Sequence, residues 1–80
     1  MNQKKVTIYS TPTCHFCHMA KDYFKEHGVA FEDYNIAMDR ERAMEMMQKT
    51  GQSGVPVIVV DDDIVVGFNQ PVLADLLGIK

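Results

Sequence analysis

Two cysteines three positions apart are the residues of this chain with the clearest capacity for chemistry. Cys14 and Cys17 enclose only His15 and Phe16, and the chain has no other cysteine. A disulfide between them would close a very small loop and add little stability, because the stabilisation from a cross-link increases with loop length. We therefore interpret the pair as chemically active rather than as a structural staple.

The cysteines lie where a predicted strand gives way to a predicted helix. The first turn of a helix offers unpaired backbone N–H groups and the positive end of the helix dipole, and both stabilise a thiolate. In such settings the pKa of a cysteine falls from about 8.5 to roughly 3.5–7.5. We therefore predict that Cys14 attacks a disulfide and that Cys17, one turn deeper and protonated at rest, resolves the mixed disulfide. A protonated His15 beside Cys14 would stabilise its thiolate further.

Three other interpretations of these residues are open. Two cysteines can occur at this spacing by chance in a reduced core. A zinc site would need four ligands, and a second pair of ligands is missing from the sequence. The run from Cys14 to His18 also matches the C-x-x-C-H pattern of c-type haem attachment. The strand directly before it and the lack of an export signal argue against haem.

The hydrophobic periodicity predicts which elements must position the cysteines. It indicates strands over 4–9, 31–36, 57–60 and 64–66, and helices from Phe16 to Gly28, from Asp39 to Lys49 and from Asn69 to Gly78. The apolar run 57–60 is typical of a strand buried on both faces, whereas the charges in 31–36 favour an edge strand. In the second helix we expect Ala43, Met44 and Met47 to face inward.

The order of these elements predicts an α/β fold. A strand, a helix and a further strand imply a right-handed parallel crossover. The acidic turn over 61–63 joins the last two strands into an antiparallel hairpin, which a final helix covers. We expect a mixed four-stranded sheet flanked by three helices, in one domain over residues 1–80.

Composition excludes several classes of function. The formal net charge is -3, and the eight Lys and Arg residues are scattered rather than clustered, which argues against nucleic-acid binding. No apolar run approaches the roughly 18 residues that a membrane span needs. The mildly basic start is not followed by the apolar region and cleavage site of a secretory signal. We therefore expect a cytoplasmic protein with no membrane contact.

The segment from Tyr9 to Cys17 resembles the active-site segment of glutaredoxins. Val55-Pro56 is similar to their Val-Pro step, and Gly67 falls where they carry a glycine-containing loop. The similarity extends over nearly the whole chain, in the same order. It implies a thiol–disulfide oxidoreductase that reduces protein disulfides or glutathione-mixed disulfides.

The resemblance also implies the thioredoxin fold and a set of site residues. In that fold Pro56 follows a cis peptide bond beside the cysteines, and the backbone of Val55 pairs with an extended peptide. Cys14 and Cys17 would be catalytic. The substrate-binding positions would be Thr11, Thr13, His15, Phe16, Gly54, Val55, Pro56, Gly67, Phe68 and Asn69.

Some residues depart from the family pattern. Where glutaredoxins usually place Pro-Tyr between the cysteines, this chain has His15-Phe16. Thr11 stands where many members have a lysine that contacts the glycyl carboxylate of glutathione. Asn69 is neutral, so it cannot pair ionically with the glutathione ammonium as an acidic residue would. Both changes weaken the expected contact with glutathione.

Gly67-Phe68 with Pro71 instead resembles the glutaredoxin-like redoxins that thioredoxin reductase recycles. Those proteins often donate electrons to ribonucleotide reductase. The electron source is therefore either glutathione or thioredoxin reductase with NADPH, and the resemblance favours thioredoxin reductase. We expect a monomer with no bound cofactor. The alternatives are a glutathione-dependent carrier of an iron–sulfur cluster, as some glutaredoxins are, and a redox-dependent binding module without turnover.

Overall fold

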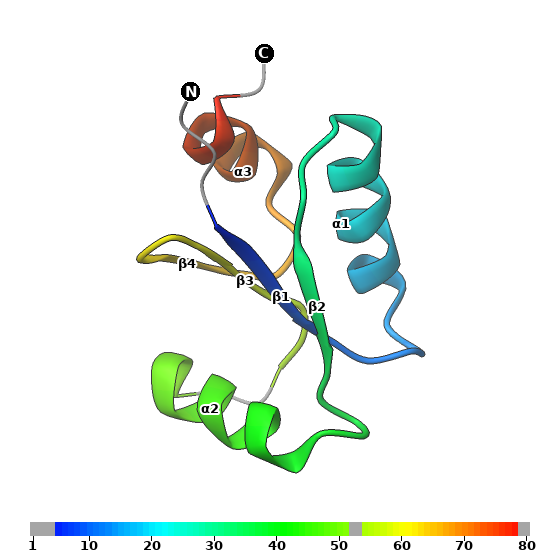
Figure 1. The fold of residues 1–80 in the computed structure, drawn as a ribbon, viewed down its shortest axis with the longest axis vertical. Helices are drawn as coiled ribbons and strands as arrows, with labels where there is room; N and C mark the ends of the chain where they lie inside the picture. Colours follow the sequence, from blue (N-terminus) through cyan, green and yellow to red (C-terminus); the bar gives the residue numbers. More distant parts are fainter. Residues whose placement is uncertain (1–4, 52–53, 79–80) are drawn as a thin grey trace.

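The computed structural model describes residues 5–51 and 54–78, which form one mixed sheet and three helices (Figure 1). The elements follow the predicted order: β1 (Val6–Ser10), α1 (His15–Glu26), β2 (Glu32–Asn35), α2 (Arg40–Thr50), β3 (Val57–Val60), β4 (Asp63–Val66) and α3 (Gln70–Leu77). The strand order is β2-β1-β3-β4, with β1 parallel to β2 and antiparallel to β3. The predicted α/β architecture is confirmed.

The two central strands carry the core because helices cover both of their faces (Figure 1). Alternate residues of a strand point to opposite faces. Val6 and Ile8 therefore join the larger cluster beneath α1 and α3, with Phe24 and Leu73. Tyr9 points to the other face, where it packs with Met46 of α2 in a smaller cluster together with Val57 and Val59. The sheet thus holds α1 against one face and α2 against the other.

The start of α2 and the end of α1 lie at the residues that the sequence predicted. Asp39 accepts a hydrogen bond from the backbone of Arg42 at 3.2 Å and caps α2. Gly28 follows the end of α1 with a φ of +67°, a conformation that glycine adopts without steric cost. None of the helices that the structure describes is both long and apolar enough to cross a lipid bilayer.

The edges of several elements differ from the predictions by one or two residues. β1 begins at Val6 and extends through Ser10, and Lys4, where the prediction began, lies outside the described residues. β2 is shorter than predicted and lies at the sheet edge, as its charges indicated. α1 begins at His15 rather than Phe16, since Cys14 itself is the capping residue.

The predicted inward face of α2 was wrong at two methionines. Met44 and Met47 are 57% and 51% exposed, whereas Met46 is buried. The rotation of the helix follows its polar contacts with the sheet. The Tyr9 hydroxyl donates to Glu45, and the guanidinium of Arg42 lies 4.1 Å from the centre of the Tyr34 ring. These contacts turn the face with Met46 toward Tyr9 and leave the other two methionines in solvent.

Candidate active site

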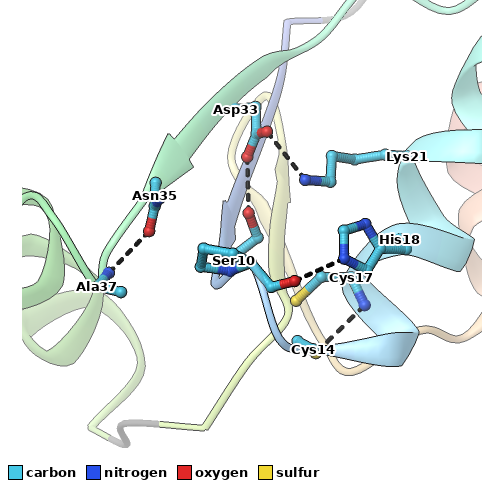
Figure 2. A network of polar contacts seen from close by, with 9 residues as sticks. Ser10, Cys14, Cys17, His18, Lys21, Asp33, Asn35 and Ala37 are labelled. Atoms are coloured by element: carbon cyan, nitrogen blue, oxygen red, sulfur yellow. Dashed lines mark hydrogen bonds and ion pairs between the residues drawn. The ribbon is translucent and has the colours of Figure 1, made fainter.

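Cys14 lies at the start of α1 and uses its sulfur as the helix cap. Its Sγ accepts a hydrogen bond from the backbone N–H of Cys17 at 3.3 Å (Figure 2). The backbone N–H of Cys14 donates to the carbonyl oxygen of Thr11, also at 3.3 Å, and this bond closes the loop after β1. The side chain is partly exposed, so a disulfide can approach the sulfur. A helix N-terminus stabilises negative charge on such an atom.

Cys17 occupies the opposite environment, one turn further along the same helix. It is fully buried. Burial, followed by the hydrogen bond with Cys14, raises the pKa of Cys17 to about 12. Its thiol therefore keeps its proton at neutral pH, in agreement with the role expected from its position. One sulfur is presented to partners and the other is held behind it.

A third segment faces the cysteines from the start of β3. The Sγ of Cys14 lies 3.9 Å from the carbonyl oxygen of Val55, to which the thiol can donate a weak hydrogen bond. The peptide bond between Val55 and Pro56 is cis, as the resemblance implied. The carbonyl oxygen of Pro56 accepts from the backbone N–H of Gly67 at 2.8 Å, which brings the loop after β4 to the same region.

The predicted residues beside the cysteines are mostly in solvent. Thr13, His15 and Gly54 are exposed, and the Phe16 side chain is 57% exposed. The rings of His15 and Phe16 meet edge to face, with 5.8 Å between their centres. This exposed aromatic surface next to Cys14 is suited to contact with a substrate.

The predicted residues after β4 have structural partners of their own. The ring of Phe68 packs against Tyr23 of α1, with 5.9 Å between ring centres. The side-chain oxygen of Asn69 accepts from the backbone N–H of Val72 at 3.4 Å and caps α3. Asn69 is thus already used as a cap, whereas Gly67 connects this loop to Pro56.

His18 is a contact of the site that the sequence did not reveal. The sequence favoured a helix-surface residue at this position, but the Nε2 of His18 lies 2.8 Å from the carbonyl oxygen of Pro12. A carbonyl oxygen only accepts, so the imidazole donates. His18 thereby ties the active-site loop to the second turn of α1.

A polar chain behind Cys17 was also missed. Lys21 forms an ion pair with Asp33, with 3.0 Å between Nζ and Oδ2, and the Ser10 hydroxyl donates to the other oxygen of Asp33 at 2.7 Å (Figure 2). The three residues come from α1, β2 and β1. Only the position of Lys21, one helical turn after Cys17, could have suggested it.

Within residues 5–51 and 54–78, no group of three or more His, Cys, Asp and Glu side chains is placed to hold a metal ion.

Comparisons with known proteins agree on one family. A family model described as Glutaredoxin matches residues 6–65. An uncharacterized glutaredoxin-like 8.6 kDa protein in the rubredoxin operon of Clostridium pasteurianum is 44% identical over 72 residues, which cover 90% of this chain and 96% of that protein. The glutaredoxin-like protein NrdH of Lactococcus lactis is 37% identical, covering 89% of this chain and 97% of the relative.

A solved structure supports the same relationship. The crystal structure of a glutaredoxin from Archaeoglobus fulgidus superposes with a TM-score of 0.83 at 28% sequence identity. The match covers 94% of this chain and 87% of that one.

The raised pKa of Cys17 predicts a specific dependence of stability on pH. The folded protein binds this proton more tightly (pKa about 12) than the unfolded chain, where a cysteine titrates near about 8.5. The contribution to stability is therefore complete below about pH 8.5 and falls by about 1.4 kcal/mol per pH unit above it, until the folded pKa is reached.

Urea unfolding of the reduced protein and of a Cys17→Ser variant, at several pH values, measures this effect. The difference between their free energies of unfolding should shrink as the pH rises through that window. A difference independent of pH would show that burial does not hold the Cys17 proton.

Proposed function

The chain belongs to the glutaredoxin family, and we propose that it reduces disulfides by a dithiol mechanism in which Cys14 attacks and Cys17 resolves. Proteins of this family are thiol–disulfide oxidoreductases, and this chain is one of them. The observation that carries the proposal is the unequal placement of two neighbouring sulfurs. Cys14 is partly exposed at a helix N-terminus, while Cys17 is buried and its backbone N–H donates a hydrogen bond to the sulfur of Cys14.

In the first step the Cys14 thiolate attacks one sulfur of a substrate disulfide. The substrate S–S bond breaks, a Cys14–substrate disulfide forms, and the other substrate sulfur leaves as a thiolate that takes a proton from water. The N–H of Cys17 and the free end of α1 stabilise the charge on Cys14 before the attack.

In the second step Cys17 loses its proton and attacks the sulfur of Cys14. The mixed disulfide breaks, the Cys14–Cys17 disulfide forms, and the substrate leaves fully reduced. The protein is then oxidised by two electrons and needs an external reductant. The i, i+3 spacing places both sulfurs on one face of α1, within reach of each other.

Serine substitutions of the two cysteines should separate the steps. Cys14→Ser should abolish reduction of an insulin or peptide disulfide, because no attacking thiolate remains. Cys17→Ser should still complete the first step and accumulate a mixed disulfide, visible as an added substrate mass in non-reducing mass spectrometry. Full disulfide reductase activity in Cys14→Ser would disprove the assignment.

For the external reductant we propose thioredoxin reductase with NADPH rather than glutathione. Two positions that many glutaredoxins use for ionic contacts with glutathione are uncharged here, Thr11 and Asn69, and the Asn69 side chain caps α3. Loss of one charge-assisted hydrogen bond costs about 1.5–3 kcal/mol, or more than tenfold in affinity. The 37% identical relative described as glutaredoxin-like protein NrdH is consistent with a redoxin of this kind.

The physiological setting follows from the same proposal. Among disulfide-containing proteins, ribonucleotide reductase is the substrate that the resemblance implies. The reaction would take place in the cytoplasm, and the protein would act as a monomer. No nucleic acid or membrane takes part in it.

Two coupled assays of NADPH oxidation test the choice of reductant. One supplies thioredoxin reductase, and the other supplies glutathione with glutathione reductase. We expect the former to sustain turnover at least about tenfold faster at equal protein concentration. The matched variant is Asn69→Asp, which keeps a good helix cap and adds the missing charge, so it should raise the glutathione-coupled rate. Equal or faster turnover with glutathione in the unmodified protein would contradict the proposal.

A further inference from the structure

We propose that Lys21 is a positioning residue that acts through Cys17, its ammonium stabilising the Cys17 thiolate in the resolving step. This inference rests on the dithiol mechanism proposed above and assigns a residue to its second half. Lys21 belongs to the same helix as the cysteines, but neither its type nor its position is part of the C-x-x-C pattern.

The first observation is the partial burial of a lysine on the cysteine face of α1. The Lys21 side chain is only 17% exposed, although lysine is among the residue types least often buried. It follows Cys17 by four residues, and side chains at that spacing lie about 5–6 Å apart at their Cβ atoms. A positive charge is thus held one turn from the buried sulfur.

The second observation is the tether that fixes this charge. Asp33 lies at 3.0 Å from the Lys21 ammonium, and its other oxygen accepts from the Ser10 hydroxyl at 2.7 Å (Figure 2). Ser10 is the last residue of β1 and is itself buried, directly before the loop that leads to Cys14. The ammonium is therefore fixed to the sheet behind the cysteines rather than free to extend into solvent.

The third observation is the difficulty of the step that this charge would assist. Burial and the hydrogen bond with Cys14 raise the pKa of Cys17, whereas a backbone hydrogen bond from Thr11 and, to a smaller extent, the charge of Lys21 lower it. Cys17 must nevertheless become a thiolate before it can attack Cys14. A nearby cation favours the charged form of a thiol, and the effect is stronger where water is excluded.

An uncharged aromatic disulfide, dithiodipyridine, allows the two steps to be followed separately. Cys14 attacks one of its sulfurs and releases the first thiopyridone. Cys17 then loses a proton to solvent, attacks Cys14 and releases the second thiopyridone, leaving the Cys14–Cys17 disulfide. Each molecule of reagent is reduced by two electrons as the protein dithiol is oxidised. Stopped-flow absorbance therefore shows two phases of equal amplitude.

Replacement of Lys21 should slow only the second phase. In Lys21→Gln we expect it to be about three- to tenfold slower, since one pKa unit changes the thiolate fraction tenfold and the higher nucleophilicity of the remaining thiolate offsets part of that loss. Lys21→Arg should restore most of the rate because it keeps the charge. Lys25→Gln, which removes an exposed lysine one turn further along α1, is the matched control and should leave both phases unchanged. An unchanged second phase in Lys21→Gln would overturn the proposal.

Asp33→Asn tests the tether. Asparagine keeps the shape, but its single amide oxygen cannot accept from both the Ser10 hydroxyl and the Lys21 ammonium. The ammonium then loses the partner that fixes it, so the second phase should slow while the first phase stays unchanged. A second phase as fast as in the unmodified protein would contradict the role of Asp33 as the tether. Cys17→Ser should release only one thiopyridone, and a second release in that variant would refute the dithiol mechanism itself, whatever the effect of Lys21.

Discussion

The proposed mechanism depends on one hydrogen bond at the start of α1, in which the backbone N–H of Cys17 donates to the sulfur of Cys14. The bond exists because Cys14 occupies the capping position, where the N–H groups of the first turn have no partner in the helix. It directs backbone dipoles at the sulfur that we propose to attack, and Cys17 lies one turn further along the helix. In this proposal the geometry of both steps is set by the local structure of four residues.

A thin core has to hold that helix end in place. A domain of this size buries only about 60% of the surface that its unfolded chain exposes. The face of α1 that follows the cysteines packs through Ala20 and Phe24 against Ile8 of the central strand. The same strand ends at Ser10 and leads directly into the loop before Cys14. β1 thus connects the packed core to the loop that carries Cys14, so the position of this helix cap follows from the position of the core.

Features that depend on neighbouring residues along the chain could be predicted from the sequence. The cysteine pair, the helix starts at Asp39 and Asn69, and the doubly buried strand β3 all follow from local patterns, and the structure confirms these starts and this strand. The placement of Pro56 beside the cysteines came from resemblance to a family, because periodicity carries no information about a peptide bond being cis.

Features that depend on side chains from different elements could not be predicted. The rotation of α2 follows the contact of Tyr9 with Glu45, and these residues are far apart in sequence. The polar contacts from Lys21 through Asp33 to Ser10 join three elements. Taken alone, each of these three residues is typical of a solvated surface. The contact of Ser10 with Asp33 depends on the register of β1 with β2, which the sequence pattern left open.

The most direct test of this account is the reactivity of the two thiols in the folded, reduced protein. Brief treatment with iodoacetamide at neutral pH, followed by peptide mass spectrometry, reports which sulfur is exposed and ionised. We expect the label on Cys14 alone, with Cys17 modified only after unfolding in denaturant. Labelling of Cys17 as fast as Cys14, or an unreactive Cys14, would contradict the unequal placement on which the mechanism rests.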